Sequence, residues 1–203
     1  MRYEREFIDA ILDEAPICHL GFVSDGTPRV LPTVHARIGT TLYLHASSGG
    51  GPALLARDGG LDVCVTVTLL DGIVLARSAF HHSMNYRSVV MHGCARLVVD
   101  SMEKTRALEA LIDHVVAGRS AGCRPPTPRE LDGTAVLALE VSEASMKARS
   151  GDPQDESGDM ALPAWAGVLP LRVVVGDPVP SADLRPGATA VPDHVDRYIR
   201  DHR

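Results

Sequence analysis

The sequence is poor in aromatic residues and in clustered positive charge, and each scarcity excludes a class of partner. Phe, Trp and Tyr make up only 4% of the 203 residues, with a single Trp. Proteins that bind single-stranded nucleic acid stack bases on aromatic side chains, so we do not expect that class. No basic run exceeds two residues and the net charge is -6, so neither nucleic acid nor an anionic membrane surface is an expected partner.

Long apolar runs, paired cysteines and familiar catalytic motifs are also missing. No apolar run approaches the roughly 20 residues that a membrane span needs. The charged N-terminus leads into an amphipathic pattern, which predicts a cytoplasmic protein. The sequence contains no nucleophile elbow, P-loop, H-E-x-x-H or Rossmann glycine pattern. The cysteines are far apart without a C-x-x-C pair, which indicates structural thiols: Cys18, Cys64, Cys94 and Cys123.

What is present is a mainly β pattern with a few helices. Helical spacing of apolar residues predicts helices over 3–14, 53–57, from the N-cap Asp100 to Gly118, and near 194–200. Strands are expected at 17–23, 29–38, 41–46, 62–70, 73–77, 88–99 and 134–141. Turns are expected at Ser24–Thr27 and at Asp71-Gly72, the second joining two apolar strands as a hairpin. Short strands joined mostly by hairpins predict an antiparallel β-barrel with flanking helices, with an α+β sandwich as the alternative.

The densest group of polar side chains lies at 76–88, where two Arg, two adjacent His, three Ser, Asn and Tyr stand beside apolar strands. Buried polar groups need partners, so this segment is expected to be a solvated loop anchored to a sheet. Loops held on rigid scaffolds are where ligand sites tend to lie. Arg87 and Ser88 suit phosphate and ring-nitrogen contacts, although Arg87 has the alternative of pairing with an acidic neighbour.

Other candidates each have a structural alternative. Gly49-Gly50-Gly51 offers backbone N–H groups to a phosphate, or forms a flexible turn. His45 shares a strand face with Tyr43 and Ser47, and it is either a structural residue or a donor to a ligand. His81 and His82 point in opposite directions on an extended chain, so no metal site is expected.

The ordered combination of these segments resembles the FMN-binding split-barrel proteins, the pyridoxamine 5'-phosphate oxidase-like superfamily. Within it, the chain is most similar to the flavin-nucleotide-binding branch that includes 5-nitroimidazole-resistance proteins. The resemblance rests on Leu42–Ser47, on the apolar strand Val63–Thr68 and on Asn85–Gly93, in the expected order along residues 3–150. Ala144–Pro153 and Ala164–Leu171 also resemble that branch.

The resemblance implies a homodimer with FMN at the subunit interface. The oxidases' Arg-x-Val-Leu-Leu-Lys strand falls on Arg29–Val34, and their Arg-Gln pair falls on Arg87-Ser88. Their Arg-Lys phosphate clamp falls on Gly50-Gly51, so Ser47, Ser48 and the glycine amides would compensate. The implied cofactor-binding residues are Arg29, Pro32, Thr33, Val34, His45, Ala46, Ser47, Ser48, Asn85, Tyr86, Arg87 and Ser88.

The expected organisation is a flavin-binding split barrel over 1–147, followed by an acidic loop and C-terminal extension over 148–203. This extension is expected to pack on the barrel or on the partner subunit. The expected function is an FMN-dependent oxidoreductase of small molecules, of the nitro/quinone-reductase or pyridoxamine-phosphate-oxidase-like type, with chemistry at the flavin. The alternatives are a flavin carrier or sensor without turnover, or a split barrel that binds deazaflavin or haem.

Overall fold

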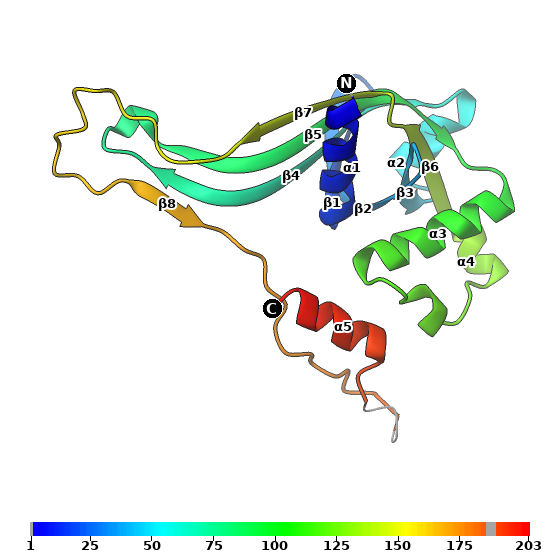
Figure 1. Ribbon diagram of the computed structural model, residues 1–203. Coiled ribbons are helices and arrows are strands. Elements are labelled where there is room, and N and C mark those ends of the chain that lie inside the picture. The colour runs from blue at the N-terminus through cyan, green and yellow to red at the C-terminus, as the bar shows by residue number, and fades with distance from the viewer. Residues whose placement is uncertain (1, 186–189) are drawn as a thin grey trace.

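A computed structural model describes residues 2–185 and 190–203 of the protein. Figure 1 shows a barrel from which a long arm extends to one side, with the C-terminal segment returning below it. The strands are β1 (Ile17–Ser24), β2 (Thr27–Ile38), β3 (Thr41–Ser47), β4 (Leu61–Leu75), β5 (Ser83–Leu97), β6 (Thr134–Glu140), β7 (Glu143–Arg149) and β8 (Gly167–Pro170). The helices are α1 (Arg2–Glu14), α2 (Gly51–Leu55), α3 (Ser101–Val115), α4 (Pro128–Gly133) and α5 (Asp193–Asp201), with short 3-10 turns η1 (Ala56–Asp58), η2 (Ala79–His81) and η3 (Ser120–Gly122).

Six strands close into a barrel. The order is β7-β5-β6-β3-β2-β1-β4-β8, and the additional pairing of β5 with β4 joins the ring. Every pairing is antiparallel. Side chains that alternate inward along the strands form the core, together with Ile8, Ile11 and Leu12 of α1 and Ala15 just after it. The predicted mainly β, antiparallel architecture with flanking helices is therefore confirmed.

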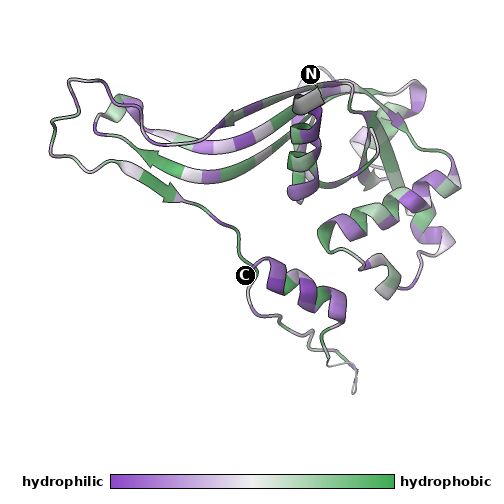
Figure 2. Cartoon of the chain, viewed as in Figure 1, coloured by the Kyte–Doolittle hydropathy of each residue, from purple (hydrophilic) through white to green (hydrophobic). Residues whose placement is uncertain are grey.

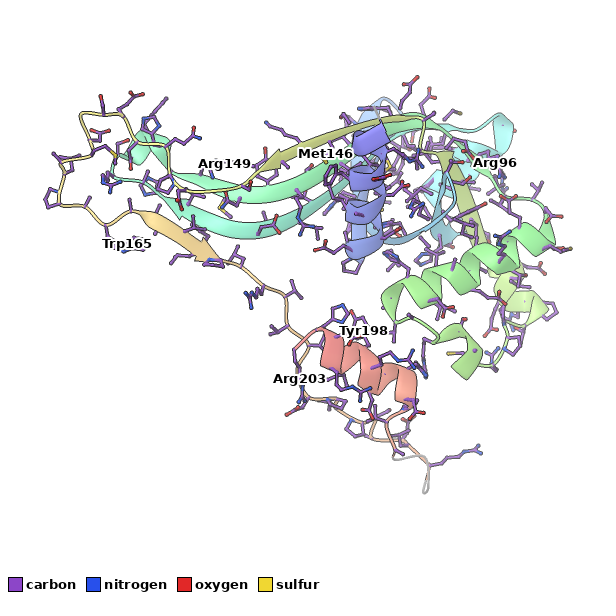
Figure 3. The ribbon with its side chains drawn as sticks, in the orientation of Figure 1. Arg96, Met146, Arg149, Trp165, Tyr198 and Arg203 are labelled. Atoms are coloured by element: carbon purple, nitrogen blue, oxygen red, sulfur yellow. The ribbon has the colours of Figure 1, made fainter. Side chains whose placement is uncertain are left out.

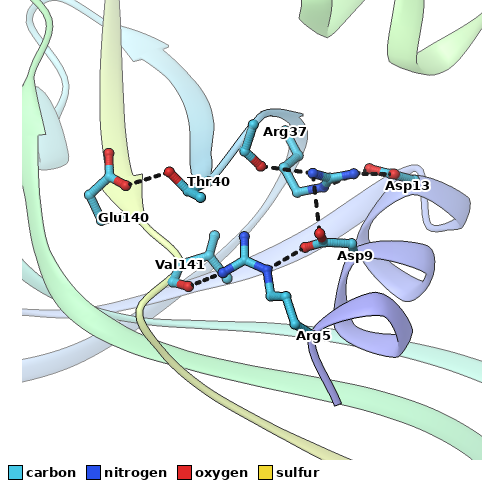
Figure 4. Close-up of polar contacts among 8 residues, drawn as sticks. Arg5, Asp9, Asp13, Arg37, Thr40, Glu140 and Val141 are labelled. Carbon is cyan, nitrogen blue, oxygen red and sulfur yellow. Dashed lines mark hydrogen bonds and ion pairs between the residues drawn. The ribbon is translucent and has the colours of Figure 1, made fainter. Parts of the chain in front are cut away.

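Helix α1 is fastened across the barrel by ion pairs (Figure 4). Arg37 of β2 donates from Nε and Nη2 to the two carboxylate oxygens of Asp13, at 3.0 and 2.5 Å. Its Nη1 also lies 3.5 Å from Asp9. Arg5 donates to Asp9 at 2.9 Å and to the carbonyl oxygen of Val141 at 2.5 Å. These contacts hold the C-terminal half of α1 against β2, which also forms part of the candidate site.

The arm is the continuation of β4 and β5 beyond the barrel. The predicted hairpin at Asp71-Gly72 is wrong, because β4 runs through both residues to Leu75 and pairs with β5 on either side of them. A register shift between Leu70 and Gly72 marks a β-bulge there. Residues 76–82 connect β4 to β5 at the tip of the arm. The predicted polar loop is therefore shorter than expected, and Ser83–Ser88 belong to β5.

Two further strands extend the arm sheet at its edges. β7 pairs with β5 from Tyr86 to His92, and β8 pairs with β4 from Gly72 to Leu75. Figure 3 labels Met146 and Arg149 along β7, and Trp165 just before β8. Several apolar side chains on this part of the chain face solvent, and Figure 2 shows hydrophobic segments along β4 and β8.

Helix α3 covers the outer face of the barrel beside β2, β3 and β6. Its N-cap is Asp100, whose side chain accepts from the backbone N–H of Glu103 at 2.7 Å, as predicted. Ala107 packs with Tyr43, Val98 and Val136 in a second apolar cluster. No helix in the described residues is long and apolar enough to cross a membrane.

Candidate functional site

Strand β3 separates the barrel core from the candidate site. Leu42 and Leu44 are fully buried in the barrel, whereas Tyr43 and His45 point to the opposite face, as the alternation predicts. Tyr43 lies under α3 and its hydroxyl donates to Glu103 at 2.9 Å. His45, the next residue on that face, is exposed.

His45 lines a groove between α3 and the strands β2 and β3. The groove has a volume of about 800 Å³. One wall is the apolar face of α3, and the opposite wall is formed by Val34 and His45. The segment after α3 closes one end with Arg119, Gly122, Cys123 and Arg124. Its size lies within the roughly 300–1,000 Å³ of sites for small organic ligands and cofactors.

A small polar cleft lies beside the groove. It has a volume of about 100 Å³ and is lined by Ser48, Arg57, Lys104, Asp132 and Thr134, among others. Arg57 donates to the carbonyl oxygen of Ser48 at 3.2 Å, and Lys104 donates to that of Leu131 at 2.6 Å. Neither cation forms an ion pair within residues 2–185 and 190–203. The two cations and two hydroxyls outnumber the single carboxylate, Asp132, so the cleft carries a net positive charge that suits a phosphate group.

The structure brings part of the predicted set together. Val34 and His45 lie on the same wall of the groove, on the neighbouring strands β2 and β3, and Ser48 lines the polar cleft. Arg29 and Pro32 are exposed on the open half of β2, where Pro32 pairs with His19 of β1. The remaining members of this group, Thr33, Ala46 and Ser47, lie on the same two strands without lining either cavity.

The predicted group at the start of β5 is divided between the two faces of the arm. Asn85 and Arg87 point one way, and Tyr86 and Ser88 the other, because alternate residues of a strand face opposite sides. Asn85 is buried, donates to the Gly151 carbonyl oxygen at 3.1 Å and accepts from Arg149. None of these four strand residues lines the groove.

Arg87 has the acidic partners that the alternative interpretation anticipated. Its guanidinium donates to both oxygens of Glu14, at 2.5 and 2.8 Å, and to both oxygens of Asp71, at 3.0 and 2.8 Å. Hydrogen bonds to Glu14 and then to Asp71 raise the pKa of Arg87 above its ordinary value. Within one chain these ion pairs link α1 to the arm. Because Nε, Nη1 and Nη2 all donate to carboxylates, few N–H groups of Arg87 remain for a phosphate.

The adjacent histidines lie at the tip of the arm, away from the groove. His82 Nδ1 lies 2.9 Å from the carbonyl oxygen of Ser78, and His81 lies 3.8 Å from Glu156. At the same tip Arg77 donates to Asp155, whose side chain is fully buried. These contacts order the tip.

Sequence reasoning missed the cations Arg57, Lys104 and Arg119. Arg57 and Lys104 are 47 residues apart in the chain numbering and meet only because α3 folds over the outside of β3 and β6. The apolar face of the helix was visible in the sequence, but its opening onto a groove was not. The missing Arg-Lys clamp at Gly50-Gly51 was the signal that cations from elsewhere were needed.

A family model and two solved structures match most of the chain. The family model described as pyridoxamine 5'-phosphate oxidase matches residues 4–148. The structure of the flavocytochrome Anf3 from Azotobacter vinelandii is 39% identical and has a TM-score of 0.88, covering 100% of this chain and 91% of that one. The FAD and heme binding protein from Mycobacterium smegmatis is 37% identical with a TM-score of 0.88, covering 95% and 94%.

A more distant structure shows the fold alone. It is described as a 5-nitroimidazole antibiotic resistance protein from Bacteroides thetaiotaomicron, and is 24% identical with a TM-score of 0.58 over 70% of this chain and 82% of that chain. A search of curated proteins finds no match.

Proposed function

Since this chain belongs to the pyridoxamine 5'-phosphate oxidase family of split-barrel proteins, we propose that it is a redox protein that binds both a flavin and a haem. The observation that carries the proposal is the apolar groove of about 800 Å³ with an imidazole on its wall, directly beside a cationic cleft. The two relatives at 37% and 39% identity, one named a flavocytochrome and the other as binding FAD and heme, support it.

The residues present fit a flavin nucleotide at the polar cleft. Arg57 and Lys104 would neutralise phosphate charge, and the hydroxyls of Ser48 and Thr134 would donate hydrogen bonds. The resemblance predicts FMN, whereas a relative's name gives FAD, so FAD is the flavin we propose. When bound, a flavin exchanges hydride or single electrons and a haem exchanges single electrons.

We also propose that the working unit is a homodimer. Large apolar side chains remain exposed in three places: Ile17, Val23 and Val30 on β1 and β2, Leu70 and Leu169 on the arm, and Trp165, Val173 and Val174 near and after β8. Exposed apolar area on this scale is typical of an interface. A second copy seated here would also bring its own Asn85–Ser88 towards Arg29–Val34, which the single chain keeps apart.

The spectrum of the purified protein tests the proposed function. We expect flavin bands together with a haem Soret band, and micromolar or tighter binding of added FAD and haem to the apoprotein. FMN and deazaflavin F420 serve as competing ligands. Bleaching by NADH or NADPH, followed by reoxidation with O₂, a quinone or a nitroaromatic, separates an oxidoreductase from a carrier. Flavin binding without haem binding would remove the haem half of the proposal, and binding of neither would remove all of it.

A further inference from the structure

We propose that His45 is the axial ligand of a haem seated in the groove between α3 and the β2–β3 face, and that Arg119 binds a haem carboxylate. This inference rests on the proposed function and assigns its metal site. Three features of the groove support it: the imidazole of His45, the apolar walls and the positive charge at one end.

His45 is the imidazole that the groove presents to a ligand. It is exposed and has no hydrogen-bond partner in the part of the chain that the structure describes. The imidazoles on β2 and α3, which also line the groove, are engaged: His35 with the carbonyl oxygen of Leu12 and His114 with that of Ala15. A neutral imidazole with a free ring nitrogen is a common ligand of haem iron. Its place on a barrel strand, paired with Val136 of β6, fixes the position of its backbone and the strand face from which the side chain projects.

The walls of the groove suit a large, flat, apolar ring. Leu108, Leu111, Ile112 and Val115 of α3 face Val34 across it. Ile112 and Val115 remain 40% and 41% exposed, so an apolar helix face is left uncovered in the single chain. Covering such area contributes about 25 cal/mol per Å². A flavin ring needs several hydrogen-bond partners along its polar edge, whereas the α3 wall is mostly apolar, with Thr105 and Glu109 as its polar side chains. A porphyrin needs such partners only at its carboxylates.

The charge at one end of the groove complements those carboxylates. Arg124 is already paired with Glu130, donating at 2.8 and 2.5 Å to the two carboxylate oxygens. Arg119 lines the same end and forms no ion pair in the described residues. Its guanidinium therefore remains available for a charge-assisted bond to a carboxylate. Arg119 lies in the segment just after α3, so the carboxylate would bind beyond the end of the helix whose apolar face covers the ring.

The test uses the full-length protein titrated with haem and measured by absorption and by reduction potential. His45→Ala is expected to weaken haem binding by at least about tenfold and to shift the Soret band. Free imidazole added to this variant should restore the wild-type spectrum. His45→Met keeps a ligating atom, and we expect it to bind haem with an altered spectrum and a higher potential. Flavin content should remain the same in both variants, which reports that the fold is intact.

Four further variants complete the design. Cys123→Ser removes the other soft donor of the groove and tests whether the thiol is the ligand. His92→Ala removes an exposed imidazole of β5, away from the groove, and should leave the haem spectrum unchanged. Arg119→Gln should weaken haem binding severalfold, whereas Arg106→Gln, exposed on α3, should not.

The outcomes separate this assignment from the proposed function. A wild-type protein that binds no haem overturns both. A wild-type protein that binds haem, with an unchanged spectrum and affinity in His45→Ala, overturns the assignment alone. Loss of the haem spectrum in Cys123→Ser would also overturn it, because the thiol would then be the ligand.

Discussion

The buried imidazole of His35 makes the stability of the protein sensitive to pH. Its side chain is fully buried, and Nε2 donates to the carbonyl oxygen of Leu12 at 2.9 Å. Its Nδ1 has no partner in the described part of the chain. The ring of His114 lies 4.8 Å away. Burial lowers the pKa of His35 from 6.5 to about 4; the bond to Leu12 opposes this shift and the neighbouring His114 adds to it.

The size and sign of the effect follow from that shift. Between pH 6.5 and about 4 the unfolded chain binds a proton at this residue and the folded protein does not. The stabilisation is therefore complete above pH 6.5 and is lost as the pH falls towards 4. The difference of about 2.5 pH units, at 1.36 kcal/mol each, corresponds to about 3 kcal/mol. Near pH 5 the slope contributed by this one group is about 1.4 kcal/mol per pH unit.

Urea unfolding at intervals from pH 7 to 4 measures this slope. His35→Gln keeps an N–H that can reach Leu12 and removes the titration, so its stability should fall less steeply than that of the wild type. His92→Gln removes an exposed imidazole and should keep the wild-type slope. Parallel curves for the wild type and His35→Gln between pH 6.5 and 4.5 would refute the reasoning.

Three further expectations concern the cofactor and the assembly. Arg57→Ala should weaken flavin binding about tenfold, or about 1.4 kcal/mol, in a fluorescence titration, with Arg106→Ala as the control; equal affinities would remove the cleft from the flavin site. Arg87→Ala should lower the free energy of unfolding by roughly 1 kcal/mol, since Glu14 and Asp71 then lose their shared cation. If flavin affinity also falls tenfold, Arg87 contacts the cofactor as its sequence position predicts. Leu169→Asp should convert a dimer to monomers in sedimentation velocity, and a monomeric wild type would contradict the proposed assembly.

Two Asp-Gly pairs show what local sequence decides and what it does not. At Asp25-Gly26 both residues have positive φ, 51° and 71°, and a tight hairpin joins β1 to β2 as predicted. At Asp71-Gly72 the same pair lies inside a strand. There a Cβ on Gly72 would come within 3.0 Å of Val168, so the glycine permits the close approach of β8. Pairing with β5 and β8 from distant parts of the chain outweighs a local turn preference.

In the candidate site, too, local sequence predicted some features and tertiary contacts decided others. Alternation along 41–47 was sufficient to place Leu42 and Leu44 inside and His45 outside, because successive side chains of a strand point to opposite faces. The engagement of Arg87 by Glu14 and Asp71 was not visible, because the three residues are far apart in the chain and become neighbours only when α1 packs beside the arm.

The sequence alone determined most of the elements, the antiparallel barrel and the family, because each depends on hydrophobic period and on the order of short motifs. It did not predict α4, β7 or β8, or the continuation of β4 through Asp71-Gly72. The tertiary structure decided where ligands can enter. The apolar spacing over 101–115 predicts an amphipathic helix with one apolar face. Only the packed structure shows that part of this face remains exposed opposite Val34 and His45. Likewise, Arg57 and Lys104 form a cleft only because the folded backbone brings them together beside Ser48.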